Sequence, residues 1–134
     1  MLTFPARVAQ GEVRKSILIA DDDLGFVVWA GSVLAGAGYQ TWPATTADDG
    51  LEWLKEPEVV FDLLLISPSL ESARELVEAA RDKSPRLKVA ALSVSDHLGD
   101  VIIDAALPKP GDAADEASAW VGTITRLLTP HLTA

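Results

Sequence analysis

The chain has 134 residues, 49% of them hydrophobic, which is enough for one globular domain that buries about two thirds of its unfolded surface. Twenty acidic residues against eleven basic ones give a formal charge of −9, so nucleic acid is not an expected partner. Cysteine is absent, which excludes disulfides and thiolate metal sites, and two histidines, His97 and His131, are too few for a zinc site.

Neither a membrane anchor nor a targeting signal is expected. The longest uncharged stretch, residues 24–47, is interrupted by Gly25, Gly31, Gly36 and Gly38, so it does not resemble a membrane span. We therefore expect a cytoplasmic protein that does not contact a membrane.

Strand and helix patterns alternate along one domain over residues 16–129. Residues 1–15 show no sustained periodicity and are predicted to be a flexible extension, and residues 130–134 a tail. Strands are predicted at 16–20, 39–42, 62–66, 87–92 and 101–107. Helices are predicted at 23–37, from 46 onward with Thr45 or Thr46 as the cap, at 70–82 and at 112–128.

The order of the strands follows from their polarity and from two prolines. The first, third and fourth strands are continuous apolar runs, as expected for strands that are buried on both faces. Pro43 and Pro108 lie next to the second and fifth strands, and proline is tolerated at sheet edges. We predict an α/β fold with a doubly wound five-stranded parallel sheet in the flavodoxin-like order 2-1-3-4-5.

Polar side chains follow the predicted strands at the ends that meet in such a sheet. Asp21 and Asp22 follow the first strand, Ser67 the third, Ser93 the fourth and Lys109 the fifth. An acidic pair suits a divalent cation, whereas a hydroxyl and a lysine suit phosphoryl oxygens. The sequence therefore predicts a site at this edge that is built for phosphoryl chemistry, except that a serine lies at its centre.

The chain resembles the CheY-like receiver domain of bacterial two-component response regulators from about residue 15 to residue 128. The segments that carry the resemblance are 17–23, 37–39, 61–67, 92–93 and 107–110. The resemblance implies that Asp21 and Asp22 match a Mg²⁺-binding pair, and that Ser93 and Lys109 match the residues that contact the phosphoryl group. It also implies a cis Lys109-Pro110 bond. Ser67 falls on the position of the aspartate that accepts phosphate from a histidine kinase.

Several departures from the receiver pattern point to a degenerate pseudo-receiver. A serine needs an activating base, which no histidine is placed to supply, and Ser67 also removes one carboxylate from the metal site. Ala106 lies where the family usually has a switch aromatic, and residues 93–100 leave little room for the usual fourth helix, which is expected to be short or missing. We therefore predict a phosphorylation-independent signalling module that binds proteins, is not an enzyme, requires no cofactor and binds Mg²⁺ weakly at most.

The first predicted helix is apolar on all sides. Val27, Val28 and Trp29 lie in this helix, and a helix without a polar face is normally covered on more than one side. We expect its outer surface to be covered by residues 1–15, by a second copy of the chain in a homodimer, or by a different protein.

Two other interpretations of these residues remain open. Asp21 and Asp23 match the Asp-x-Asp motif of haloacid-dehalogenase-like phosphohydrolases, with Ser93 and Lys109 as the later motifs, although no cap domain is present. Alternatively, the chain is a receiver that is phosphorylated at a non-standard residue such as Asp22. The acidic run also suits a simple helix cap.

Overall fold

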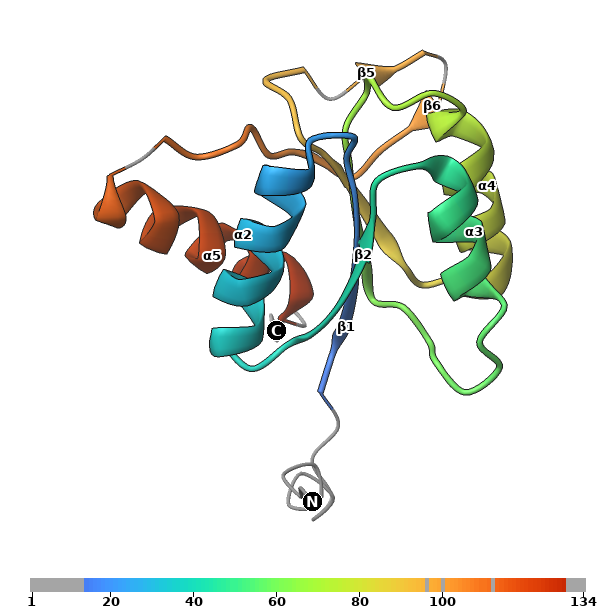
Figure 1. Cartoon of the computed structure of the whole chain (residues 1–134), viewed down its shortest axis with the longest axis horizontal. Coiled ribbons are helices and arrows are strands. Elements are labelled where there is room, and N and C mark those ends of the chain that lie inside the picture. The colour runs from blue at the N-terminus through green and yellow to red at the C-terminus, as the bar shows by residue number, and fades with distance from the viewer. Residues whose placement is uncertain (1–13, 96, 100, 112, 130–134) are drawn as a thin grey trace, which may run out of the picture.

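The computed structural model describes residues 14–129, apart from residues 96, 100 and 112. A parallel sheet lies between two pairs of helices (Figure 1). Its strand order is β2-β1-β3-β4-β7, which is the order predicted from the sequence, with β7 as the fifth strand. The predicted extension before residue 14 and the tail after residue 129 lie outside the described residues.

Strands β1 (Ser16–Ala20), β3 (Leu63–Ile66) and β4 (Lys88–Ala91) form the centre of the sheet. All residues of β1 and β3 are buried, because helices cover both faces. Side chains alternate between two hydrophobic clusters: Leu18 packs on the α3 and α4 side, whereas Ile17 and Ile19 pack on the α2 and α5 side. The prediction of buried central strands is confirmed.

Four helices cover the sheet. Helices α2 (Leu24–Gly36) and α5 (Ala114–Leu128) lie on one face, and α3 (Ala47–Leu54) and α4 (Ala73–Lys83) on the other (Figure 1). Over the part of the chain that the structure describes, no helix has both the length and the apolar character needed to cross a membrane.

Edge strand β2 (Gln40–Ala44) is longer than predicted. It contains Pro43, which pairs in register with Ile19. The sequence predicted that this strand would end before Pro43, but a proline in an edge strand can direct its missing donor away from the ladder. The edge position itself is confirmed.

The fifth strand was predicted at residues 101–107, and this extent is wrong. Strand β7 (Ala105–Ala106) joins the sheet beside β4, whereas β6 (Val101–Ile102) pairs with β5 (His97–Leu98) in a separate antiparallel hairpin. Asp104 explains why the chain joins the sheet only at β7. Its carboxylate accepts a hydrogen bond from Val89 N at 2.7 Å, and its own backbone N–H donates to Val89 O at 2.8 Å. Gly99, between β5 and β6, has φ +62°, which suits a tight hairpin turn.

This hairpin occupies the part of the chain where a fourth receiver helix was predicted to be short or missing. Among the described residues between β4 and β7, no helix forms, which agrees with that prediction.

Candidate functional site

The ends of four strands are aligned at one edge of the sheet. Ala20 pairs with Ile66, Ile66 with Ala91, and Ala91 with Ala106. The ladder continues one residue further, since Ser67 N donates to Ala20 O at 2.9 Å. The polar residues that follow the strands are therefore brought to the same edge.

Asp21 is a buried carboxylate at this edge. Only 1% of the residue is exposed, its Oδ1 accepts a hydrogen bond from Asp23 N at 2.9 Å, and its Oδ2 lies 2.8 Å from Lys109 Nζ. The Oδ2 atom receives no aligned hydrogen bond from the described residues, so its pairing with the ammonium is electrostatic. A buried carboxylate without such a partner would cost several kcal/mol.

Lys109 has three neighbours whose direct contacts with it were not predicted from the sequence, although Asp21 was expected in the same site. Besides Asp21, its Nζ lies 4.0 Å from Asp23 Oδ2 and 4.6 Å from the centre of the Phe26 ring, a cation–π distance. The Lys109-Pro110 bond was predicted to be cis, but the described chain contains no cis peptide bond. The trans form is the favoured state of an X-Pro bond, and this prediction is therefore wrong.

The other two acidic residues of the run have different surroundings. Asp23 caps α2, because its Oδ1 accepts a hydrogen bond from Phe26 N at 3.1 Å. Asp22 is exposed and lines a groove of about 450 Å³ together with Thr45, Thr46 and Glu71. The acidic run thus includes the cap that was considered from the sequence.

Ser67 and Ser93 direct their hydroxyls into local turns. Ser67 Oγ lies 2.9 Å from Ser69 Oγ and accepts a hydrogen bond from Ser69 N at 3.3 Å, whereas Ser93 Oγ accepts from Ser95 N at 3.1 Å. Among the described residues, no hydrogen bond or ion pair joins either serine to Asp21 or Lys109. Ala106, which the resemblance places at the switch position, is half-buried in β7.

A divalent cation does not fit these residues as they are arranged. Within the described ranges, no group of three or more His, Asp or Glu side chains is placed to hold a metal ion. Mg²⁺ requires close to six oxygen ligands, but the Asp21 carboxylate is already paired with an ammonium and Ser67 supplies no charge. The predicted metal pair therefore consists of one paired carboxylate and one exposed carboxylate.

The predicted interface on α2 has a different membership in the structure. Val27 is buried against the sheet, and Trp29 is half-buried with its ring 5.5 Å from that of Trp120. Val27 is therefore not part of an outer surface, because it contributes to the core. The outer surface carries Leu24 and Val28, which are 63% and 59% exposed.

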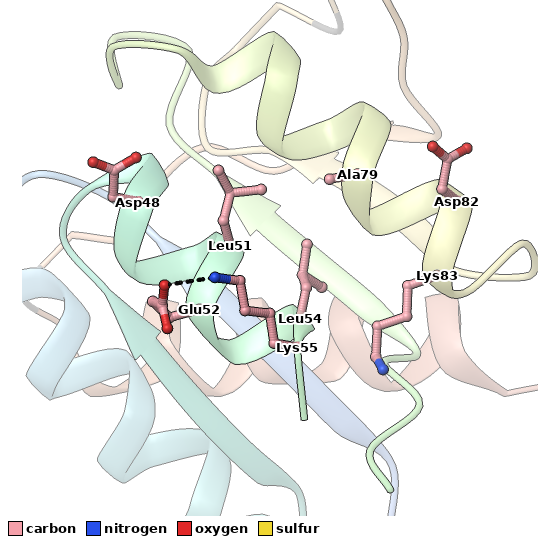
Figure 2. Close-up of a pocket in the computed structure, with 8 residues that line it drawn as sticks. All are labelled: Asp48, Leu51, Glu52, Leu54, Lys55, Ala79, Asp82 and Lys83. Carbon is pink, nitrogen blue, oxygen red and sulfur yellow. Dashed lines mark hydrogen bonds and ion pairs between the residues drawn. The ribbon is translucent and has the colours of Figure 1, made fainter. Parts of the chain in front are cut away.

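A larger groove, of about 750 Å³, lies away from this edge between α3 and α4 (Figure 2). Its apolar lining consists of Leu51, Leu54 and Ala79, and the Lys55–Glu52 ion pair lies on its rim at 3.0 Å. Sequence reasoning missed it, because the distance between two helices is not encoded in either helical pattern. Charged residues make up the rest of the lining: Asp48, Glu52, Lys55, Asp82 and Lys83.

Comparisons with solved structures identify the fold. CheY4 of Vibrio cholerae is 19% identical, with a TM-score of 0.68, over 87% of this chain and 100% of that chain. CheY6 of R. sphaeroides, in complex with the P1 domain of CheA3, is 19% identical over 85% of this chain and 95% of the matched chain, with a TM-score of 0.67. A response regulator from Burkholderia pseudomallei, with a phosphorylated aspartic acid, a calcium ion and citrate, is 20% identical over 86% of this chain and 66% of that chain, with a TM-score of 0.64.

The chain has the α/β fold of the CheY-like receiver domains of response regulators. No protein-family model and no curated protein matches the sequence.

Proposed function

We propose that this chain is a receiver-like module of two-component-type signalling that acts by binding other proteins and does not depend on phosphorylation. The fold supports the general assignment, because similar solved structures include a chemotaxis response regulator and the receiver domain of a hybrid histidine kinase. The proposed role is protein binding and not catalysis. The proposed place of action is the cytoplasm.

Ser67 is the observation that carries the proposal. It directly follows β3, where the receiver resemblance places the phosphoacceptor aspartate, and its hydroxyl is hydrogen-bonded to the hydroxyl of Ser69. A neutral hydroxyl without a neighbouring base is a poor nucleophile toward phosphorus, whereas a carboxylate is already ionised at neutral pH. We infer that phosphoryl transfer to the position after β3 has been lost while the fold that presents protein-binding surfaces is retained.

One of the similar structures suggests a kind of partner to test. CheY6 of R. sphaeroides forms a complex with a P1 domain. A P1 domain of this type is therefore the first partner to test, and the exposed Leu24 and Val28 of α2 are the first surface to test. A second copy of this chain is the other partner that the apolar surface suits.

The experiment compares wild-type protein with Ser67→Asp after incubation with acetyl phosphate and Mg²⁺. Intact mass spectrometry should detect no phosphate on the wild type, and Ser67→Asp should bind Mg²⁺ more tightly because it adds a third carboxylate to the edge. Ser67→Asn, which changes the side chain without adding charge, is the matched control.

Each site of labelling has a distinct meaning. Phosphate on Ser67 would overturn the proposal, phosphate on Asp22 would identify a receiver that is phosphorylated at a non-standard residue, and phosphate on Asp21 would favour the dehalogenase-like alternative. If Ser67→Asp bound Mg²⁺ no better than Ser67→Asn, the proposed convergence of these residues would be wrong.

A further inference from the structure

We propose that Lys109 is an internal counter-ion to Asp21 and Asp23. Its ammonium replaces the charge of a divalent cation at this edge of the sheet, and its contacts hold the segment after β7 against helix α2. The proposal starts from the misfit between the acidic pair and a metal, and it does not depend on which protein the domain binds.

The first step is the charge on Asp21. This carboxylate is almost completely buried, and a buried negative charge without a positive neighbour carries a large desolvation cost. Lys109 Nζ, 2.8 Å from Oδ2, supplies a full positive charge from within the chain. An incoming Mg²⁺ would have to displace this ammonium before it could use Asp21 as a ligand.

The second step is the fixed position of the ammonium. Asp23 Oδ2 lies 4.0 Å away, and the face of Phe26 lies 4.6 Å away. Phe26 itself packs against Trp120 of α5 at 5.9 Å, in an edge-to-face arrangement. The ammonium is thus held between two carboxylates and an aromatic ring, although 36% of the Lys109 side chain is exposed.

The contacts of Lys109 also connect two elements of the fold. Lys109 lies between β7 and α5, whereas Asp23 and Phe26 belong to the start of α2. One side chain therefore links the edge of the sheet to the aromatic contact between α2 and α5. Without the ammonium, the edge would keep two neighbouring carboxylates, Asp21 and Asp23, with no cation between them.

The test measures thermal unfolding of wild type, Lys109→Met and Lys55→Met, with and without millimolar Mg²⁺ at matched ionic strength. Lys55→Met is the control, since it breaks an ion pair between two largely exposed side chains. We expect Lys109→Met to lower the midpoint by about 5–10 °C and Lys55→Met by about 2 °C or less. Mg²⁺ should raise the midpoint of Lys109→Met by a few degrees and leave the wild type unchanged.

A double variant in which both partners are neutral separates the effect of the unpaired charge on stability from the effect of lost packing. In the double variant Asp21→Asn/Lys109→Met, no buried charge remains, so its midpoint should exceed that of Lys109→Met and should not respond to Mg²⁺. If Lys109→Met fails to fold but the double variant folds, the counter-ion role is supported.

Three results would overturn the inference. They are a wild-type midpoint that Mg²⁺ raises as much as that of Lys109→Met, a double variant that is no more stable than Lys109→Met, and equal losses in Lys109→Met and Lys55→Met. None of these results bears on protein binding or on phosphate labelling of Ser67, so the proposed function is tested independently of this inference.

Discussion

Single side chains close the N-termini of two helices. Thr46 Oγ1 accepts a hydrogen bond from Asp49 N at 3.0 Å at the start of α3, as Asp23 does for Phe26 N in α2. Each cap satisfies one backbone donor that the helix itself leaves unpaired. These contacts show how residues in the loops at the sheet edge also fix the helices that cover the sheet.

Thr46→Ala tests this contribution at a position outside the Lys109 contacts. We expect the variant to lose about 1 kcal/mol of unfolding free energy, because Asp49 N loses its acceptor. The neighbouring Thr45→Ala is the control, since Thr45 makes only a 3.4 Å contact to the exposed Asp49 carboxylate. Urea unfolding measures both variants, and equal losses would contradict the assignment of the cap to Thr46.

The contact between α3 and α4 depends on a glycine. A Cβ added at Gly50 would lie 2.8 Å from both terminal carbons of Leu76, which is fully buried. The two helices pack closely here because Gly50 has no side chain.

Gly50→Ala should therefore destabilise the domain by about 1–3 kcal/mol, since Leu76 cannot move without disturbing the core. Gly36→Ala is the matched control, because nothing lies within 4 Å of a Cβ added at the exposed end of α2. That control should be neutral or more stable by about 0.5–1 kcal/mol. Chemical denaturation would contradict the packing argument if Gly50→Ala were as stable as wild type.

The outer surface of α2 is not covered by other residues that the structure describes. No residue of α2 is charged, and Leu24 and Val28 lie one turn apart in the exposed part of the helix. Burial of these side chains against a second copy or a partner would remove apolar surface from water.

Val28→Asp should abolish the association without a loss of stability, because the side chain is exposed in the isolated domain. Val60→Asp is the control, since Val60 is 67% exposed but lies in the segment between α3 and β3. Sedimentation compares the mass of each variant with the 14.2 kDa of one chain, and titration with a P1 domain tests the other partner. A monomeric wild type whose partner binding is the same in both variants would rule out this surface.

The sequence correctly predicted the central strands, which are buried on both faces of the sheet. It was less accurate for elements whose conformation depends on a few individual contacts. Continuous apolar runs identified β1, β3 and β4, and prolines identified the edges, so the strand order followed. The hairpin of β5 and β6 was missed, because its formation depends on Gly99 and on Asp104 holding β4. Val27 was assigned to the outer surface because an all-apolar helix does not indicate which side faces the sheet.

For the candidate site, the sequence predicted the place but not the contacts. The residues after parallel strands must meet at one edge, so the region of Asp21, Ser67 and Lys109 was predictable from topology. The pairing of Lys109 with Asp21 and its contact with Phe26 depend on the path of the chain between β7 and α5. That path has no periodic pattern, and a resemblance to receivers does not determine it.

At the scale of the whole molecule, one sheet supports two hydrophobic clusters. The α3 and α4 side contains Trp42 and Trp53, and the α2 and α5 side contains Trp29 and Trp120. Side chains of β1 and β3 alternate between the two clusters. Unfolding of either side would therefore expose residues of the central strands, and neither cluster can be lost while the sheet remains intact.

We predict that both clusters unfold in a single transition. In the variant Trp42→Phe/Trp53→Phe, fluorescence reports the α2 and α5 side, and in Trp29→Phe/Trp120→Phe it reports the other side. Within each variant, the urea midpoint from fluorescence should equal the midpoint from far-ultraviolet circular dichroism. The two variants are expected to differ in stability from each other, because they lose different contacts. One such contact is the 2.7 Å hydrogen bond from Trp53 Nε1 to Pro43 O. Comparison within a variant removes this difference, so a fluorescence transition that precedes the loss of secondary structure in either variant would mean that one side of the sheet opens independently.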